Sequence, residues 1–139
     1  MSKILIITNN PCIKGYLREQ PAVQMGRMPP LEDADIKYID GGVEAVLAKV
    51  RDLVHIGYPL ISHPLPASIQ MLHSPYRSVM MGAAPGELDP AHVAAAEGCL
   101  EKHRRCMRRE PIAGAACEDY MWIDAQHLIA GFKEYPPIP

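Results

Sequence analysis

Residues 36–62, IKYIDGGVEAVLAKVRDLVHIGYPLIS, decide the fold because they predict three secondary-structure elements in succession. Ile36 to Asp40 has the composition of a short strand and is followed by two glycines that interrupt it. Five apolar residues then recur at helical spacing: Val43, Val46, Leu47, Val50 and Val54. Gly57 is suited to the end of that helix, and Tyr58 to Ser62 predicts another strand. A strand, a helix and a strand within roughly 30 residues match a βαβ unit, so we expect an α/β fold.

The N-terminal part of the chain extends this pattern. Lys3 to Thr8 is a continuous apolar run without alternation, which predicts the central strand of a parallel sheet, covered on both faces. Asn10 is suited to cap a helix over Cys12–Glu19, with Pro11 at its first position. Several prolines then exclude regular structure from Gln20–Asp35, which we expect to be a long surface loop.

The C-terminal half adds one more strand and two helices. A loop over His63–Pro75, punctuated by prolines, leads into a strand over Tyr76–Met81. Asp89-Pro90 is a capping residue followed by proline, which predicts a long helix to about Arg109. A last helix is predicted over about Cys117–Phe132.

The composition of the 139-residue chain is that of an average folded domain, with 48% hydrophobic and 22% charged residues. We expect one α/β domain over residues 1–135, with a mainly parallel sheet of about four strands and helices on both faces, and a proline-rich tail at 136–139. A net charge of -2 gives no electrostatic footprint for nucleic acid or an anionic membrane. The cysteines form no C-x-x-C pair and the N-terminal apolar run is too short for a signal sequence, so we expect a soluble cytoplasmic protein.

Four short motifs occur in an order that is found in a known family. They are Thr8-Asn9-Asn10-Pro11, Val50-Arg51-Asp52, His63-Pro64-Leu65 with Ser68-Ile69, and Ser74-Pro75-Tyr76-Arg77-Ser78-Val79. Over about the first eighty residues the sequence resembles the GrdX family, small proteins encoded beside the components of glycine reductase in anaerobic amino-acid-fermenting bacteria. The resemblance implies this genomic setting, with glycine reductase subunits as candidate partners. It implies no mechanism.

Polar residues of these motifs follow the predicted strands. In an open α/β sheet, ligands bind beyond the carboxyl ends of the strands, where helix N-termini also expose N–H groups. We therefore predict a site for a small carboxylate or phosphate metabolite, formed by Thr8, Asn9, Asn10, Ser62, His63, Ser68, Tyr76 and Arg77. The prediction assumes that the first and third strands run side by side in the same direction. In the competing interpretation, Asn10 is only a helix cap and Arg77 pairs at the surface.

Three further groups of residues have both a functional and a structural interpretation. One face of the long helix carries His92, Cys99, His103 and Cys106, which could bind a metal or act in redox chemistry, although burial against the sheet explains them more simply. The end of the same helix carries Lys102, Arg104, Arg105, Arg108 and Arg109, which could bind an acidic partner but are also favoured at a helix C-terminus. Asp124 and His127 could form a base and the group that orients it, but we expect a surface contact.

Two functions remain open. The first is a non-catalytic accessory protein of the glycine reductase system, which holds a small anionic metabolite or a reductase subunit at the strand ends. The alternative is a small enzyme in which His63 acts as acid or base and Arg77 anchors a carboxylate or phosphate. Neither G-x-G-x-x-G nor G-x-x-x-x-G-K follows the first strand, so no nucleotide cofactor is predicted. The sequence leaves homodimer formation open.

Overall fold

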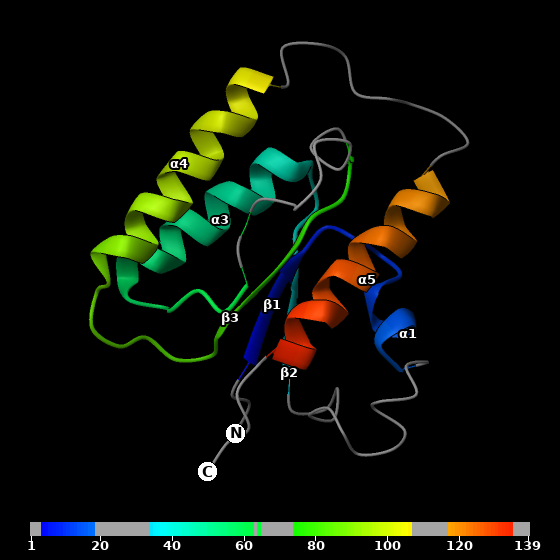
Figure 1. Ribbon diagram of the computed structural model, residues 1–139, viewed down its shortest axis with the longest axis horizontal. Coiled ribbons are helices and arrows are strands. Elements are labelled where there is room, and N and C mark those ends of the chain that lie inside the picture. Colours follow the sequence, from blue (N-terminus) through cyan, green and yellow to red (C-terminus); the bar gives the residue numbers. More distant parts are fainter. Residues whose placement is uncertain (1–3, 19–33, 63, 65–73, 107–116, 135–139) are drawn as a thin grey trace.

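A computed structural model describes residues 4–18, 34–62, 64, 74–106 and 117–134 of the chain. Its elements are, in order, β1 (Ile4–Thr8), α1 (Ile13–Arg18), β2 (Ala34–Tyr38), α3 (Val43–Ile56), β3 (Ser78–Gly82), α4 (Pro90–Cys106) and α5 (Cys117–Glu134). Figure 1 shows the strands in the centre, with α3 and α4 on one side and α1 and α5 on the other. The α/β class that the sequence predicts is confirmed.

The described residues form a three-stranded sheet with strand order β2-β1-β3. β1 pairs in parallel with β2, where Thr8 lies opposite Tyr38. It pairs antiparallel with β3, where Thr8 lies opposite Ser78. The central position predicted for β1 is therefore confirmed. The mainly parallel sheet of about four strands is wrong, because this sheet is mixed and has three strands.

The predicted strand over Tyr58–Ser62 does not form. In this segment only Leu60 makes an isolated β-bridge to β3. The N–H groups of its last two residues both donate to the carbonyl of Met80, and the Met80 N–H donates to the hydroxyl of Ser62 (2.8 Å) in place of a backbone carbonyl. On the other side of the bridge, Pro59 has no N–H to donate. The ladder is therefore interrupted in both directions.

β3 runs antiparallel to β1 because the chain returns to the sheet at the end where it left it. A parallel strand would need a crossover to the opposite end of the sheet. Instead, Arg77, which precedes β3, donates a hydrogen bond from Nη1 to the carbonyl of Pro64 (2.7 Å), close in sequence to Ser62. The first residues of β3 consequently lie beside the last residues of β1.

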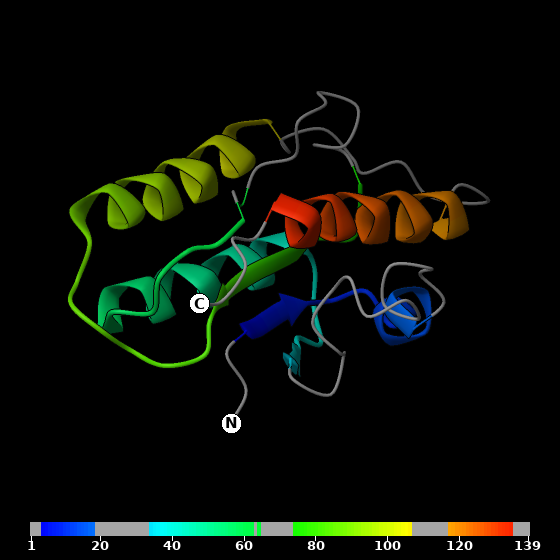
Figure 2. The same cartoon turned by 60° about the horizontal axis from the view of Figure 1, so that its bottom comes forward.

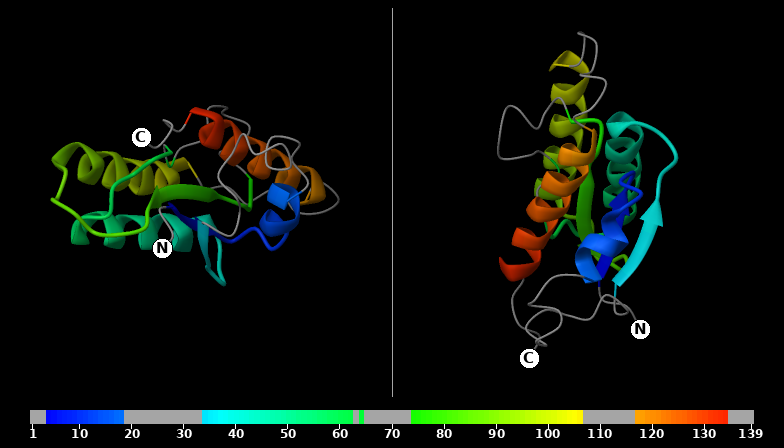
Figure 3. Two further views of the ribbon diagram at one scale, coloured as in Figure 1. Left: turned by 90° about the horizontal axis from the view of Figure 1, so that it is seen from below. Right: turned by 90° about the vertical axis from the view of Figure 1, so that its right-hand side faces the viewer.

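Helices cover both faces of this sheet. Ile7 of β1 and Val79 of β3 lie opposite each other and pack with Val50 and Val54 of α3 in one apolar cluster. Ser78 points to the other face, because side chains alternate along a strand, and its hydroxyl contacts α5. Figure 3 shows α3 and α5 on opposite sides of β3, and Figure 2 shows α4 alongside α3 and α1 beyond the end of β1.

α3 has the boundaries that the sequence predicts. Its buried residues include all five apolar positions of the helical pattern, together with Leu53. Gly57 adopts the left-handed conformation (φ 115°), and its N–H donates to the carbonyls of Leu53 and Val54, so it ends the helix as predicted. The predicted cap of α4 also forms, since Oδ1 of Asp89 accepts a hydrogen bond from the N–H of Ala91 (2.9 Å).

Some predicted segments fall outside the described residues. The predicted loop over Gln20–Asp35 does so except for its last two residues, which belong to β2 and move the start of that strand to Ala34. The predicted tail at 136–139 also lies outside them, as do the last residues of the helix predicted to reach Arg109.

Replacing Gly57 by alanine is expected to lower the free energy of unfolding by about 2 kcal/mol. The left-handed conformation strains any L side chain, and a Cβ at this position would lie 2.3 Å from the carbonyl oxygen of Gly86. Chemical denaturation of both proteins measures the difference. Gly86→Ala is the matched control, because a Cβ there meets no atom within 4 Å. Equal stability of the two variants would contradict the prediction.

Candidate functional site

The carboxyl end of β1 and the start of β3 bring polar side chains together at one end of the sheet. We call this group the polar rim; it consists of Thr8, Asn9, Asn10, Arg77 and Ser78, with Asp124 from α5. Four of its members belong to the site predicted from the sequence. The assumption behind that prediction is wrong, because β3 lies between β1 and the segment predicted as the third strand. The residues converge because β3 is antiparallel, so that its first residue pairs with the last residue of β1.

Asn9 connects three backbone segments through its side chain. Its Nδ2 donates to the carbonyls of Gly41 (3.0 Å) and Pro75 (2.8 Å), and its Oδ1 accepts from the N–H of Arg77 (2.8 Å). Both amide protons are used, and the side chain is buried. Asn9 therefore fixes the turn before α3 and the chain before β3 against the end of β1.

Asn10 connects β1 to two helices. Its Oδ1 accepts from the N–H of Cys12 (3.0 Å), which is the predicted capping interaction at the start of α1. Its Nδ2 donates to the carbonyl of Met121 (2.9 Å) and to Oδ2 of Asp124 (3.0 Å), both in α5. The capping role is thus confirmed, and attachment of α5 is a second role that the sequence did not indicate.

A chain of hydrogen bonds runs through the rim and ends at Asp124. The hydroxyl of Ser78 donates to Oδ2 of Asp124 (2.6 Å) and is 2.7 Å from the hydroxyl of Thr8. Because Ser78 has a single hydroxyl proton, Thr8 is the donor in the bond between the two hydroxyls. The Thr8 hydroxyl in turn accepts from the N–H of Asn10 (2.9 Å). All three bonds are therefore oriented toward the carboxylate, an arrangement in which each bond polarises the next.

Asp124 corrects one expectation from the sequence. We expected a surface contact with His127, but Asp124 is 4% exposed and faces the sheet, whereas His127 is exposed. Burial raises the pKa of Asp124, and the hydrogen bonds from Ser78 and Asn10 and the positive charge of Arg77 oppose this effect. Asp124 lies one turn before buried Leu128 and next to buried Ala125, so the helical spacing of α5 was the signal that could have identified it as inward-facing.

Arg77 carries the positive charge of the rim and is 5% exposed, which contradicts surface pairing. Its Nη1 donates to the carbonyl of Pro64 (2.7 Å). Burial lowers the pKa of Arg77, while the negative charge of Asp124 raises it. Arginine is almost never so completely buried unless it is paired, and here Asp124 lies within electrostatic range. A guanidinium in this setting favours a further anion, because it can donate two parallel hydrogen bonds to a carboxylate or phosphate.

His103 of α4 faces the same region and was not predicted as a ligand-binding residue. Its side chain is 6% exposed, and its Nδ1 has no hydrogen-bond partner. Burial lowers the pKa of His103, the charge of Arg77 lowers it further, and Glu44 raises it. His103 is therefore a neutral, buried imidazole within electrostatic range of the guanidinium. The sequence signal was its position four residues after Cys99, which placed both on one helix face.

The remaining predicted site residues have other positions. Ser62 is used by the backbone, since its hydroxyl accepts from the N–H of Met80 (2.8 Å). Tyr76 lies in the chain that enters β3, where its N–H donates to the hydroxyl of Ser74 (3.2 Å). His63 and Ser68 lie outside the described residues.

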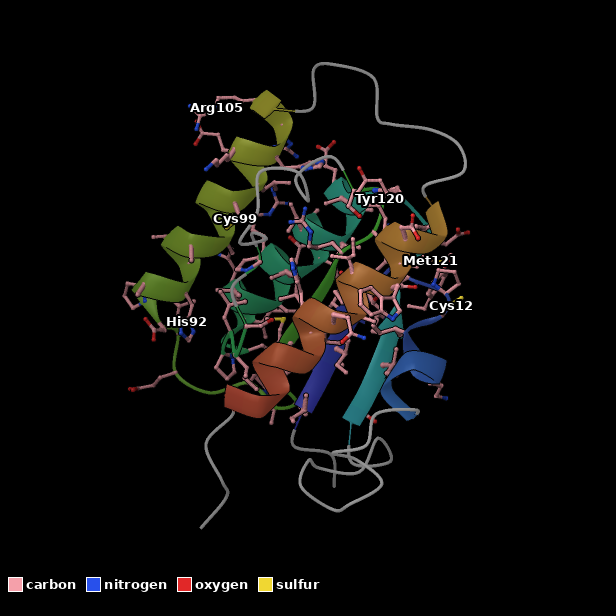
Figure 4. The ribbon with its side chains drawn as sticks, turned by 45° about the vertical axis from the view of Figure 1, so that its right-hand side comes forward. Cys12, His92, Cys99, Arg105, Tyr120 and Met121 are labelled. Carbon is pink, nitrogen blue, oxygen red and sulfur yellow. The ribbon has the colours of Figure 1, made fainter. Side chains whose placement is uncertain are left out.

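The predicted cluster of histidines and cysteines on α4 is described in part, because the side chain of Cys106 lies outside the described residues. His92 is used locally, since its Nδ1 accepts from the N–H of Leu60 (3.2 Å). Figure 4 shows His92, Cys99 and Arg105 spaced along α4, with Cys12 far away beside α5. Cys99 is buried and Cys12 is exposed, and neither forms a disulfide. In the part of the chain that the structure describes, no group of three or more His, Cys, Asp or Glu residues could hold a metal ion.

The cations at the end of α4 include one ion pair with a neighbouring helix. Nε of Arg104 donates to the carboxylate of Glu44 in α3 (2.6 Å), and both side chains are about half exposed. Such an exposed pair contributes roughly 0–1 kcal/mol. Arg108 and Arg109 lie outside the described residues.

The fold and the rim define a small α/β protein in which a mixed sheet gathers buried polar and charged groups at one end. Among the described residues, no helix combines the length and apolar character needed to cross a membrane. The chain belongs to the GrdX-like protein family, whose model matches residues 5–132. The resemblance seen over the first eighty residues is therefore confirmed, and the match continues into α5. No curated protein and no solved structure matches the chain.

Proposed function

We propose that this protein is a non-catalytic accessory protein of the glycine reductase system of amino-acid fermentation, and that it binds a small anionic metabolite at the polar rim. Membership of the GrdX-like family supports this setting. The sequence predicts eight ligand-binding residues: Thr8, Asn9, Asn10, Ser62, His63, Ser68, Tyr76 and Arg77. Of these, we assign contact with the anion to Arg77 and a supporting role to Thr8, Asn9 and Asn10, whereas a role for the other four stays a prediction. A reductase subunit is the other candidate occupant of the same end of the sheet.

The observation that carries the proposal is the burial of Arg77 at this end of the sheet. A guanidinium loses much of its hydration when it is 5% exposed, and proteins bury charged groups together with opposite charges and hydrogen-bond acceptors such as the Pro64 carbonyl here. Asp124 offsets part of this cost, although its Oδ2 also accepts bonds from Ser78 and Asn10. A small anion would add negative charge and acceptor atoms where the cation is desolvated. In a low-dielectric site such charge-assisted hydrogen bonds are stronger than in water.

The asparagines have a supporting role in this proposal. The side-chain amide of Asn9 is bonded to backbone groups on three sides, and that of Asn10 to α1 and α5. Asn9 therefore holds in place the backbone that carries Arg77, and Asn10 holds α5, which carries Asp124. Arg77 makes the contact with the anion. Preorganisation of this kind lowers the entropic cost of binding.

Small anions are expected to raise the melting temperature of the wild-type protein and to lose most of this effect in Arg77→Lys. The probes are acetate, propionate, inorganic phosphate and sulfate. At a ligand concentration of about 100 times Kd, the stabilisation is roughly 2.7 kcal/mol, which is several degrees for a domain of this size. Lysine keeps the charge but cannot form the two parallel hydrogen bonds of a guanidinium.

Arg105→Lys is the matched control, because Arg105 is exposed on α4 and the same chemical change is made there. This variant is expected to respond to anions like the wild type. If no anion stabilises the wild type, but the protein co-purifies with a reductase subunit, docking replaces metabolite binding as its function. Equal anion responses in Arg77→Lys and the wild type would place the anion elsewhere.

A further inference from the structure

The Nδ1 atom of His103 is buried without a hydrogen-bond partner. It is the one buried side-chain nitrogen or oxygen atom in this state among the described residues. Buried polar atoms in folded proteins are nearly always bonded, and an exception calls for an explanation such as an absent ligand. The side chain is 94% shielded from solvent, so bulk water does not compensate for the missing partner.

The position of His103 is fixed by the packing of α4 on α3. Leu100, one turn earlier on the same helix face, packs against Val43 and Leu47 of α3. Arg104, the next residue, bonds Glu44 in the first turn of α3. His103 therefore lies at the end of the helix pair where α3 begins. Gly41, which precedes α3, accepts a hydrogen bond from Asn9 of the rim, and the same Asn9 side chain accepts from the N–H of Arg77.

Arg77 approaches the same place from the sheet. The guanidinium interacts electrostatically with His103 and also with Cys99, one turn earlier on the same face of α4. Both Arg77 and His103 are buried; Arg77 directly precedes β3, and His103 lies near the end of α4. A cation and an uncharged imidazole, each able to donate hydrogen bonds, thus face one region from two sides.

The charges around this region select the ligand. Glu44 is paired with Arg104, and Asp124 accepts bonds from Ser78 and Asn10. The guanidinium of Arg77 therefore faces the region with the carboxylate of Asp124 within electrostatic range, and His103 adds no charge. A second negative charge on the ligand would be repelled by Asp124, so a singly charged anion fits better than a doubly charged phosphate.

We propose that His103 and Arg77 together form the binding site for a small monocarboxylate, with His103 Nδ1–H and the guanidinium of Arg77 donating hydrogen bonds to its two oxygens. The site rests on the function proposed above and adds a residue from α4 that the sequence did not assign to it. The neutral tautomer that carries its proton on Nδ1 supplies the donor, and the carboxylate supplies the partner that Nδ1 lacks.

Acetate binding by the wild type, His103→Leu and His103→Asn tests this site. Leucine has a similar size and no polar atom, so affinity for acetate is expected to fall about tenfold or more, as for loss of a hydrogen bond to a charged group. Unliganded His103→Leu should melt at or above the temperature of the wild type, because it removes an unpaired polar atom. Asparagine places its amide nitrogen close to the position of Nδ1, so His103→Asn is expected to keep most of the affinity.

The outcomes distinguish this site from the function on which it rests. In one outcome, acetate stabilises the wild type, the stabilisation is lost when Arg77 is replaced, and His103→Leu binds acetate with unchanged affinity. This result would show that His103 is not part of the site, and it would leave the proposed function intact. Phosphate that binds more tightly than acetate would overturn the monocarboxylate preference. If neither anion shifts the melting temperature or the imidazole NMR signals of His103 in the wild type, both proposals fail.

Discussion

Asn9→Ala is expected to lower the free energy of unfolding by about 4 kcal/mol, the largest effect of any single substitution at the rim. The alanine leaves three backbone groups without their partner: the carbonyls of Gly41 and Pro75 and the N–H of Arg77. Each buried group that loses its partner costs about 1–3 kcal/mol. For a domain with a total stability of roughly 5–15 kcal/mol this is a large fraction, and urea denaturation followed by circular dichroism measures it.

Asn9→Asp separates hydrogen bonding from side-chain volume. The carboxylate can still accept from the N–H of Arg77, but it cannot donate to the two carbonyls and faces their partial negative charges. We expect a loss of stability comparable to that of the alanine variant, although almost no volume is removed. If Asn9→Asp were as stable as the wild type at neutral pH, the two donated hydrogen bonds would not contribute as described.

Asp124→Leu is expected to have the second-largest effect, a loss of about 3 kcal/mol. The leucine removes the acceptor of Ser78 and Asn10, and it removes the negative charge of Asp124 that favours the buried cation of Arg77. Asp124→Asn is the matched control, because its amide oxygen can occupy the position of Oδ2 and accept both bonds. This variant is expected to lose about 1 kcal/mol or less at neutral pH, since only the interaction with the guanidinium is weakened. Equal losses in the two variants would show that charge, rather than hydrogen bonding, is the main contribution of Asp124.

The pH dependence of stability in the wild type and in Asp124→Asn tests the raised pKa of Asp124. A raised pKa means that the folded protein holds this proton to a higher pH than the unfolded chain. Between the two pKa values the folded state binds more protons, so the contribution of Asp124 to stability falls as pH rises through that window and is constant above it. Asp124→Asn has no titrating group at this position and should lack this fall.

The lowered pKa of His103 acts in the opposite direction, with stability falling as pH drops below the ordinary histidine value.

The helices could be predicted because local patterns determine them. The valine and leucine spacing of α3 requires one buried face, and Gly57 is one of few residues that can end a helix in the left-handed conformation. The caps Asn10 and Asp89 are also local, since each accepts a hydrogen bond from an N–H two residues later. Tertiary packing did not override any of these preferences.

The sheet could not be predicted to the same extent because strand pairing and direction are not local. An apolar run such as Tyr76–Met81 has the same pattern in a parallel and an antiparallel strand. Its direction depends on where the chain re-enters the sheet, which the bond from Arg77 to Pro64 reveals. Tyr58–Ser62 has the composition of a strand. The N–H of Met80, however, donates to the hydroxyl of Ser62, whereas in a β-ladder it would donate to a backbone carbonyl.

The candidate site was predicted in part. Thr8 is the last residue of an apolar strand, and Asn9 and Asn10 directly follow it, so all three had to lie at its carboxyl end. His103 and Asp124 come from helices whose placement against the rim depends on the whole fold. Their helix faces could be read from the spacing of the sequence, whereas their distance from Arg77 could not.

The hydrogen bond between Asn10 and Asp124 joins residues 114 positions apart. Contacts that close such long loops carry a high entropic cost and generally form late in folding. During synthesis on the ribosome, the three described strands emerge before α5, the helix that supplies the carboxylate. A nascent polypeptide can therefore assemble its sheet while Asn10 and Ser78 still lack their final acceptor, which becomes available only when α5 has been synthesised.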